Sequence, residues 1–419
     1  MEKLFSVSEV ADMLGVSKET LRRWDKTQKL VPQRHPMNGY RVYNLDDLRV
    51  FEQLSFMFQN SQTATLEQET EPVRTYTSIE LFAGAGGLSL GFERAGIHHE
   101  LLSEIDKHAC QTLRQNRPLW NVVEGDVSQI DFTPFNGKVD ILSGGFPCQA
   151  FSYAGKKLGF QDARGTLFYE FARAVKEVEP LIAVGENVRG LLSHDDGKTL
   201  KGMIDILTEL GYEVLPPQVL KAIFYNVPQK RERLIIVALK KGENLKFEYP
   251  TPSKEIKTLR DALFAGTLYE SDVPKSEGQN YPKEKAEVLQ LVPPGGYWRD
   301  LPLDIQKSYM KQSYYLGGGK TGMARRISWD EPCLTLTCSP AQKQTERCHP
   351  DETRPFTVRE YARIQTFPDE WSFSGSIASQ YKQIGNAVPV SLAEAVGKAI
   401  VQSLNTYESE KRLGGIHNL

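Results

Sequence analysis

The cysteine at position 148 lies in the setting most typical of covalent chemistry in this sequence. It follows the apolar run Val139–Ser143 through two glycines, Phe146 and Pro147. Such a run predicts a strand, and α/β proteins place their sites where parallel strands end. A lone cysteine is most often a small buried hydrophobe. The proline and glycines around Cys148 instead favour a rigid, exposed turn on which a thiolate can act as nucleophile.

An acid and two arginines stand at the ends of further predicted strands. The apolar run Ala183–Val188 carries Glu186 near its end, and Arg231 and Arg233 come directly before the apolar run Leu234–Leu239. Because strand ends of one sheet share an edge, we expect these side chains to converge on the nucleophile.

A glycine-rich turn follows the first predicted strand of this region. The run Thr77–Phe82 leads into Ala83, Gly84, Ala85, Gly86 and Gly87, and then into a helical pattern. Glycines in such a turn let the backbone approach a nucleotide-like ligand closely. The third glycine of a dinucleotide fingerprint would fall at position 89, where Ser89 stands, so a pyrophosphate is not favoured.

Two carboxylates end the next two predicted strands. Glu104 follows Leu101–Ser103, and Asp126 follows Val122–Val123 through a short turn. Each acid alone is as easily a helix cap or a salt-bridge partner. Together, they suit the ribose hydroxyls and the adenine amino group of a nucleoside. One glycine turn and two such acids predict an adenosine ligand without a pyrophosphate, and S-adenosylmethionine fits that description.

The elements that must position these residues follow an α/β rhythm. Short apolar runs alternate with helical patterns from Tyr76 to about Leu239, which predicts a Rossmann-like α/β fold around a parallel sheet. Regularity fades over residues 250–353, and a helical region from Thr357 to about Leu404 ends in a polar tail. The polar stretch Gln59–Arg74 reads as a flexible linker.

The first 58 residues predict a helix-turn-helix. Ser6 and Glu9 form a capping-box pattern, Gly15 stops the helix, and Ser17 begins a basic second helix. The turn signal Asn38–Gly39 predicts a wing hairpin. A small helical oligomerisation module is the alternative. The charge of this segment does not decide between the two, because it has nearly as many acidic as basic residues, but the placement of the basic residues favours DNA. The DNA contacts that we expect here are Lys18, Thr20, Arg22, Arg23 and, on the wing, Arg41.

The composition is that of an ordinary globular protein. The 51 basic and 53 acidic residues nearly balance, so the totals do not announce nucleic-acid binding, although a local basic surface is compatible with it. We expect a cytoplasmic protein without a membrane segment or a signal peptide. The odd number of five cysteines argues against disulfides. Cys333, Cys338 and Cys348 have poor spacing for zinc, and free thiols are the preferred interpretation.

Six motifs in order resemble the DNA cytosine-5 methyltransferases, over nearly everything from Ile79 to Val390. They are Phe82–Gly87, Gly145–Gln149, Glu186–Val188, Gln229–Arg233, Arg354–Glu360 and Gln383–Pro389. The N-terminal segment resembles the MerR-type winged helix-turn-helix, including Leu21–Trp24 and Gly39–Tyr43.

The resemblance implies a mechanism. Cys148 would add to carbon-6 of a flipped-out cytosine, Glu186 would bind the ring nitrogen N3 and the amino group, and Arg233 would hold the carbonyl oxygen O2. Arg231 would support the same pocket. The positions that would match the cofactor pocket are Phe82, Ala83, Gly84, Gly86, Gly87, Glu104, Ile105, Asp126, Pro147, Asn386 and Val388.

The resemblance also implies a division of the chain. We expect a helix-turn-helix domain (1–58), a linker (59–74), a catalytic domain (75–250), a target-recognition domain (251–353), the completion of the catalytic domain (354–405) and a tail (406–419). In the recognition domain Arg325 and Arg326, with the run Gln342–Gln344, are candidate DNA contacts, although a solvated charged loop explains any one of them equally well.

Several functional alternatives remain open. Part of the family acts on tRNA, and a regulator with an inactive methylase domain would share these motifs. The sizeable recognition region and the helix-turn-helix favour double-stranded DNA as substrate. An amino-group methyltransferase would need an Asp/Asn-Pro-Pro-Tyr/Phe motif, which the sequence lacks. We further expect a restriction–modification context with a cognate endonuclease, and an N-terminal domain that binds the promoter of its own gene.

Overall fold

The computed structural model describes residues 4–35, 39–58, 71–147, 166–317 and 320–416. Its internal contacts divide the chain into two compact units. The first comprises Met1–Glu69 together with Thr251–Ile256, and the second comprises Thr70–Pro250 with Lys257–Leu419. Cys148 lies outside the described residues, and so does the predicted turn residue Asn38.

The first unit contains the predicted helix-turn-helix. Its elements are β1 (Phe5–Ser6), α1 (Val7–Leu14), α2 (Lys18–Lys26), β2 (Gln33–Arg34), β3 (Arg41–Tyr43), η1 (Asp46–Leu48) and η2 (Glu52–Phe58). Ser6 and Glu9 form the capping box, Gly15 ends α1 with φ of 69°, and Ser17 caps α2. Strands β2 and β3 pair antiparallel, as a wing requires. The helical signals and the wing are therefore confirmed.

The second unit is built on an eight-stranded sheet. In order along the sheet the strands are β10 (Gln218–Lys221), β12 (Glu232–Lys240), β8 (Ile182–Val188), β7 (Ile141–Gly144), β4 (Tyr76–Leu81), β5 (Ile97–Glu104) and β6 (Val122–Glu124), with β9 (Tyr212–Val214) paired to β12. The strands from β8 to β6 are parallel, but β12 is antiparallel to β8, β10 and β9. The sheet is thus mixed, not wholly parallel as the sequence suggested.

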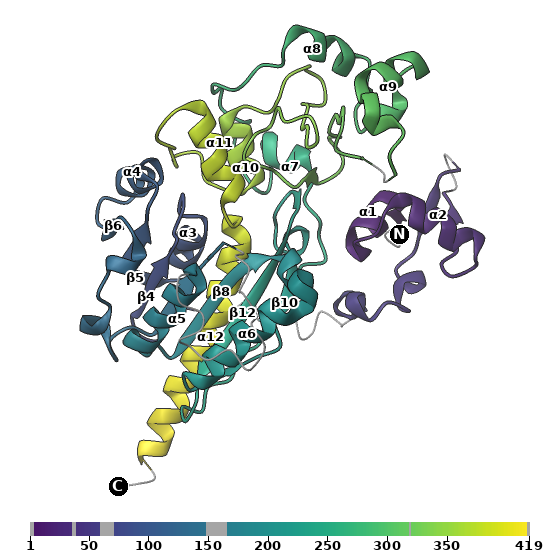
Figure 1. Ribbon diagram of the computed structural model, residues 1–419. Helices are drawn as coiled ribbons and strands as arrows, with labels where there is room; N and C mark the ends of the chain where they lie inside the picture. Colours follow the sequence, from purple (N-terminus) through teal and green to yellow (C-terminus); the bar gives the residue numbers. More distant parts are fainter. Residues whose placement is uncertain (1–3, 36–38, 59–70, 148–165, 318–319, 417–419) are drawn as a thin grey trace. The chain divides into compact units, whose positions relative to one another are not determined.

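Two apolar cores cover the sheet. On one side α5 (Leu167–Val178) and α6 (Lys198–Glu209) pack over strand residues such as Ile79, Leu142 and Ile236. The other side is covered by α3 (Gly87–Arg94) and α12 (Val390–Ile416), which lie against each other (Figure 1). Helix α4 (Lys107–Asn116) lies between β5 and β6 in the chain.

Residues from the C-terminal third contribute to the second core and form a third. Helices α7 (Leu259–Leu263), α10 (Val358–Ile364) and α11 (Ile377–Asn386) pack with Leu90 and Leu102. A separate core, which includes Tyr281, Trp298 and Met323, holds α8 (Lys283–Gln290) and α9 (Leu303–Met310) together. The short strands β11 (Gln229–Lys230) and β13 (Cys333–Leu334) pair beside these regions.

The last helix is longer than the sequence suggested. Helix α12 continues to Ile416, twelve residues past the helical region that we predicted to end near Leu404. The stretch Ile377–Leu413 is long and apolar enough to cross a membrane, contrary to our expectation that no stretch would be. However, 72% of its most apolar window is buried inside the protein, which is typical of a core helix.

The last residues of the predicted linker belong to the second unit. Arg74 forms ion pairs with Asp140 and Glu408, and the Val73 amide donates to Asn405. These contacts attach the start of β4 to α12.

Candidate active site

A buried ion pair lies at the ends of β8 and β12. Arg233 Nε lies 2.5 Å from Glu186 Oε1, and the two side chains are only 9% and 12% exposed. Burial raises the pKa of Glu186, and the charge of Arg233 opposes this shift. The pair therefore consists of a carboxyl group that tends to keep its proton and a guanidinium that has few other partners. Such a pair is expected at a site that binds a polar ring.

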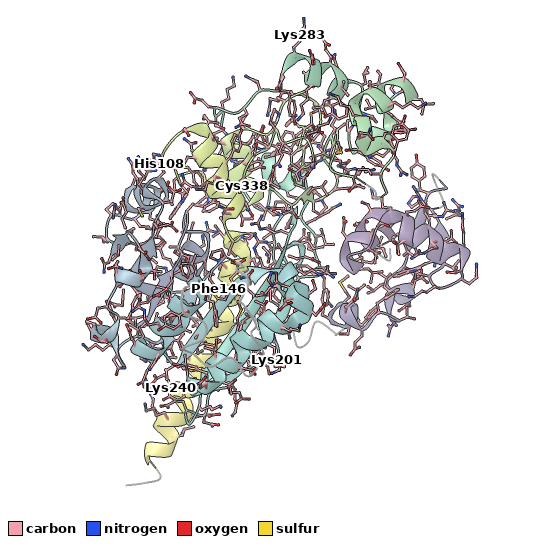
Figure 2. The ribbon with its side chains drawn as sticks, in the orientation of Figure 1. His108, Phe146, Lys201, Lys240, Lys283 and Cys338 are labelled. Atoms are coloured by element: carbon pink, nitrogen blue, oxygen red, sulfur yellow. The ribbon has the colours of Figure 1, made fainter. Side chains whose placement is uncertain are left out.

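The strand that leads to Cys148 passes directly over Glu186. A Cβ atom at Gly145 would lie 2.8 Å from Glu186 Oε2, so only glycine allows this close approach. The Asn187 amide donates to the Phe146 carbonyl at 2.8 Å. Phe146, labelled in Figure 2, is buried, and the following Pro147 is exposed. These contacts fix the chain on β8 immediately before the expected nucleophile.

Arg231 has different surroundings from Arg233. It is 3% exposed and donates to the carbonyls of Leu336, Gly385 and Ala387. Its guanidinium therefore joins the region before β12 to the segment after β13 and to the end of α11. This arrangement fits the supporting role expected of Arg231.

The glycine-rich turn is held by the first of the two strand-end acids. Glu104 Oε2 accepts from the Gly84 amide at 2.7 Å, and Oε1 accepts from the amides of Ile105 and Asp106. Gly86 begins α3 with φ of 86°. A Cβ at Gly87 would lie 2.2 Å from the Val388 carbonyl oxygen, so the turn lies against the end of the catalytic region.

The other expected cofactor positions surround this turn. Ile105 is 70% exposed, and the exposed Asp126 caps η3 (Val127–Gln129). Asn386 is exposed and accepts from Cys338 Sγ at 2.9 Å. A Cβ at Gly84 would meet nothing within 4 Å. An open turn, an exposed apolar side chain and an exposed carboxylate fit a nucleoside, so the residues present suit an adenosine-containing cofactor.

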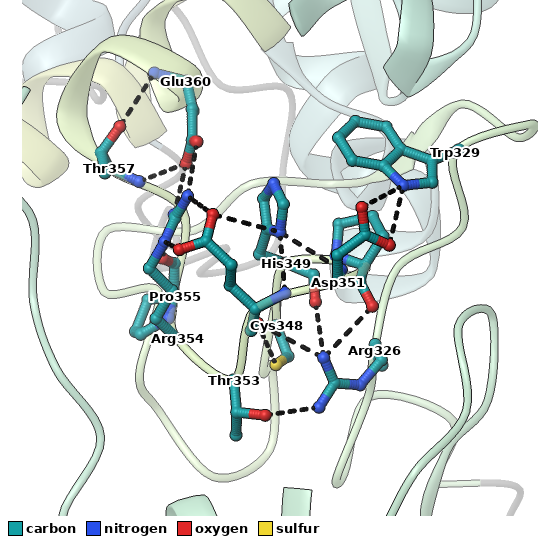
Figure 3. Close-up of polar contacts among 12 residues, drawn as sticks. Arg326, Trp329, Cys348, His349, Asp351, Thr353, Arg354, Pro355, Thr357 and Glu360 are labelled. Atoms are coloured by element: carbon teal, nitrogen blue, oxygen red, sulfur yellow. Dashed lines mark hydrogen bonds and ion pairs between the residues drawn. The ribbon is translucent and has the colours of Figure 1, made fainter. Parts of the chain in front are cut away.

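The two neighbouring arginines of the expected recognition domain differ sharply. Arg326 is 4% exposed and donates to a ring of carbonyls that includes Val292, Leu289 and His349. Figure 3 shows it beneath the segment 348–354. Its guanidinium holds these carbonyls together inside the protein. Because the side chain is buried and fully engaged in this way, the expectation that Arg326 contacts DNA is wrong.

Arg325 has no hydrogen bond or ion pair from its guanidinium to any described residue. It is half-buried, and its guanidinium carbon lies 6.0 Å from the centroid of the Tyr297 ring. Burial lowers its pKa. Unlike Arg326, this cation has no carbonyl or carboxylate partner among the described residues and retains the capacity to bind an anion.

The first unit presents most of its expected contacts to solvent. Lys18, Arg22 and Arg23 are exposed on α2, whereas the Thr20 hydroxyl is within hydrogen-bond distance of the Ser17 hydroxyl. On the wing, Arg41 forms an ion pair with Asp25. Four expected contacts therefore lie on one helix.

Two polar residues to which the sequence assigned no role of their own are buried at this site. Gln229 bonds to the Gln365 side chain and to the Leu336 amide, which joins β11 to two other segments. Glu80 is 2% exposed on β4, beside the glycine turn. The available signal for Glu80 was a charged residue inside an otherwise apolar strand.

Comparisons with known proteins agree with this geometry. The model of the C-5 cytosine-specific DNA methylase family matches residues 76–402, and that of the MerR family regulatory protein matches residues 6–43. Type II methyltransferase M.Eco47II from Escherichia coli is 65% identical over 97% of each chain. Type II methyltransferase M.PspPI from Psychrobacter sp. (strain TA137) is 59% identical over 96% of each chain.

A solved structure agrees with the fold. An Escherichia coli prophage protein described as a DNA modification methyltransferase superposes with a TM-score of 0.61 at 26% identity, covering 79% of this chain and 100% of its own. The fold, the family match and the relatives give one conclusion. The chain belongs to the C-5 cytosine-specific DNA methylase family and is an S-adenosylmethionine-dependent type II DNA (cytosine-5-)-methyltransferase with a MerR-type N-terminal segment.

Proposed function

We propose that the enzyme methylates a cytosine turned out of a specific duplex site, with Cys148 as the nucleophile. The observation that carries this proposal is the buried Glu186–Arg233 pair directly beneath Gly145. Gly145 stands three residues before Cys148, at the edge of the sheet where the cofactor turn also lies. A cytosine within a stacked duplex cannot reach a buried pair, so the base must be flipped, at a cost of about a few kcal/mol.

Each side chain has a definite part in this mechanism. The Cys148 thiolate adds to carbon-6, and the ring electrons move to carbon-5, which takes the methyl group. Glu186, whose pKa is raised by burial, donates a proton toward N3 and accepts from the amino group, while Arg233 binds O2. Water then takes the carbon-5 proton, and the thiolate is expelled. When bound, S-adenosylmethionine supplies the methyl group on its sulfonium.

The cofactor is assigned to the glycine turn and its neighbours. The open backbone at Gly84 would admit the methionine part, Glu104 and Asp126 would bind ribose and adenine, and Ile105 would cover the ring. Phe82, Ala83, Gly86 and Pro147 would line the same region. Asn386 and Val388 would close it from the end of α11. Because DNA is its substrate, we expect the enzyme to work in the cytoplasm.

Methyl transfer from labelled S-adenosylmethionine tests the reaction and its substrate together. Unmethylated duplex DNA and tRNA are offered to the full-length protein and to the Cys148→Ser variant. We expect label only in duplex DNA, at carbon-5 of cytosine, and none with the variant. Label in tRNA alone would show that the substrate is RNA and not DNA.

A second cysteine substitution provides the control. Cys338 is exposed and bonds to Asn386, and a serine hydroxyl can keep that hydrogen bond. Cys338→Ser should therefore retain methyl transfer. If Cys148→Ser retained activity as well, Cys148 would not be the nucleophile.

The recognition region is assigned to residues 251–353, with Arg325 as a DNA contact. The lack of a hydrogen-bond partner for its buried Nε among the described residues and the separate core around Trp298 support this assignment. Bisulfite sequencing of plasmid from cells that express the enzyme would give the target site. Resistance of that plasmid to an endonuclease cutting at this site would support a cognate restriction partner.

The N-terminal unit supports a second candidate function, the regulation of its own gene. The exposed residues Lys18, Arg22 and Arg23 on α2 favour this role, because the second helix of such units enters the major groove. A general increase in DNA affinity is the alternative, and it predicts steep salt dependence without sequence preference. Footprinting the full-length protein on its own upstream DNA separates the two.

A further inference from the structure

A short antiparallel ribbon holds Arg325 in a fixed place within the region 251–353. Residues 295–298 run beside residues 323–327, and backbone hydrogen bonds join Gly295 to Ile327, Gly296 to Arg326, and Trp298 to Met323. On the other side of the ribbon, the Arg325 carbonyl accepts from the Cys348 amide at 3.0 Å. Because the backbone is held on both sides, the Arg325 side chain extends from a rigid base.

The two faces of this ribbon lie against different cores. Arg326 donates to carbonyls within the core around Trp298, whereas Ile327 packs with Cys333 of β13 in the other core. Side chains alternate along an extended chain, so Arg325 shares the face of Ile327. Arg325 is also close enough to Cys333 for its charge to act on that thiol. It therefore lies on the face toward β13, which pairs with β11 directly before Arg231.

The Arg325 side chain is left without a hydrogen-bonding partner within the described part of the chain. Its Nε atom is buried, and a buried donor that lacks a partner costs free energy. The carboxylates whose charges act on it are engaged elsewhere, since Glu331 pairs with Lys230 and Asp300 accepts from the Tyr297 amide. An acceptor from outside the protein would satisfy this group.

The surroundings of this guanidinium suit a flat group with two acceptors. The Tyr297 ring lies beside it, and half-burial limits how far the side chain can swing. A guanidinium presents its donors in a rigid planar fork, which matches two acceptors that lie side by side. In DNA, guanine presents O6 and N7 in this way in the major groove, which is wide enough for a two-stranded ribbon. Phosphate oxygens are the other paired acceptors of DNA.

We propose that Arg325 is a specificity-determining residue that binds O6 and N7 of a guanine in the target site, with the Tyr297 ring beside the bound base edge. This proposal rests on the proposed function, in which Arg325 contacts DNA, and it names the group that is bound. Any duplex site of a cytosine methyltransferase contains at least one guanine, because the target cytosine is paired with one. A half-buried fork beside an aromatic ring favours this flat edge over a phosphate.

Changes of a single atom in the DNA test this assignment. The probes are duplexes of the site mapped by bisulfite sequencing, in each of which one guanine is replaced by 7-deazaguanine, which lacks N7 but still pairs with cytosine. The full-length wild type should bind one of these duplexes more weakly than the unmodified duplex. Arg325→Ala should bind the unmodified duplex about 5- to 150-fold more weakly than the wild type does. It should bind that one modified duplex no more weakly still.

The salt dependence of binding separates a base contact from a phosphate contact. Loss of one phosphate contact weakens binding to every duplex equally and reduces the salt slope by about 0.9. If Arg325→Ala showed this pattern and still discriminated against the modified guanine that the wild type senses, Arg325 would bind phosphate and the proposal would be overturned. A wild type that sensed no modified guanine, or a variant that bound as tightly as the wild type, would overturn it as well.

Arg299→Ala is the matched control. Arg299 is an exposed arginine of the same region, and its guanidinium carbon lies 5.2 Å from the centroid of the Trp298 ring. This variant should remain sensitive to the modified guanine that the wild type senses, and an equal loss of sensitivity in both variants would count against Arg325. Methyl transfer to the unmodified duplex is measured alongside. Its absence in the wild type would remove the proposed function itself, whereas the outcomes above concern Arg325 alone.

Discussion

At the scale of single residues, the Glu186–Arg233 pair decides whether the site is stable as well as active. Both side chains are nearly buried, so removing one partner leaves the other charge uncompensated. Glu186→Gln should therefore lower the free energy of unfolding by roughly 3 kcal/mol or more. Denaturation with urea measures this change.

The double variant separates charge balance from packing. In Glu186→Gln with Arg233→Met both charges are absent, so much of the lost stability should return. Both proteins should be inactive, because neither can donate a proton to N3, and the double variant also lacks the group that binds O2. A double variant that was less stable than either single variant would contradict this account.

Glu80 gives the protein a pH dependence of definite sign. Its pKa rises from 4.5 to about 8 on folding, so the folded state holds a proton that the unfolded state loses across this window. Stability should fall relative to Glu80→Gln as pH rises from 5 to 8, by on the order of a few kcal/mol. Thermal unfolding of both proteins without cofactor at pH 5, 7 and 9 measures this. A constant difference in Tm would rule out the titration.

Arg325 and Arg326 are neighbours in the chain, yet we expect their substitution to have different effects. Arg326→Ala should lower the free energy of unfolding by about 3 kcal/mol or more, because it leaves several buried carbonyls unpaired. Arg325→Ala should leave Tm nearly unchanged and weaken binding to target DNA. Melting curves and gel shifts on both variants test the pair. Equal effects on stability would refute the distinction.

The sequence could not separate these arginines, since neither residue type nor spacing reports which carbonyls a chain will bring together. Arg231 and Arg233 show the same limit, because one binds three distant carbonyls and the other pairs with Glu186. Strand-end position was informative. It predicted that Glu104 and Glu186 lie at one edge of the sheet, and both residues lie there. The position of Cys148 at the same edge stays a prediction.

At the scale of elements, the contact between α3 and α12 links the cofactor turn to the C-terminal region. A Cβ at Gly91 would lie 2.4 Å from Ala393 Cβ and 2.6 Å from the Glu394 amide nitrogen. Gly91→Ala must therefore push the helices apart, at a cost of about 1–3 kcal/mol. Because the turn lies at the start of α3, affinity for S-adenosylmethionine should also fall. Calorimetry and thermal unfolding measure both effects.

Gly266 provides the control for this helix contact. It is exposed, and an added Cβ would meet nothing within 4 Å. Gly266→Ala should therefore change neither stability nor cofactor affinity appreciably. If it behaved like Gly91→Ala, the effect would not come from the packing of α3 on α12.

The order of elements was predictable where apolar runs alternate with helical patterns, from β4 to β8. The antiparallel direction of β12 was not, because hydrophobic periodicity carries no information on strand direction. The polar composition after Leu404 suggested a tail, yet α12 continues to Ile416. Ion pairs such as Arg74–Glu408 and Lys246–Glu410 attach its polar end to the unit.

At the scale of the whole molecule, the chain joins a methyltransferase unit to a smaller unit that contains the MerR-type helix-turn-helix. The smaller unit includes Thr251–Ile256, so it is built from two separate segments of the chain. If the smaller unit binds upstream DNA as proposed, that binding can be changed without changing methyl transfer. Arg23 on α2 and Arg49 after η1 are both exposed arginines of this unit and form a matched pair.

We expect Arg23→Ala in the full-length protein to weaken binding to its own upstream DNA and to reduce the salt slope by about 0.9, the value for one lost phosphate contact. Methyl transfer to target DNA should remain unchanged, since the catalytic residues all lie in the other unit. Arg49→Ala, whose guanidinium pairs with Asp46, should alter neither property. Fluorescence anisotropy at several salt concentrations measures the slope. Equal losses for the two variants, or parallel losses of methyl transfer, would mean that the smaller unit serves general affinity rather than promoter recognition.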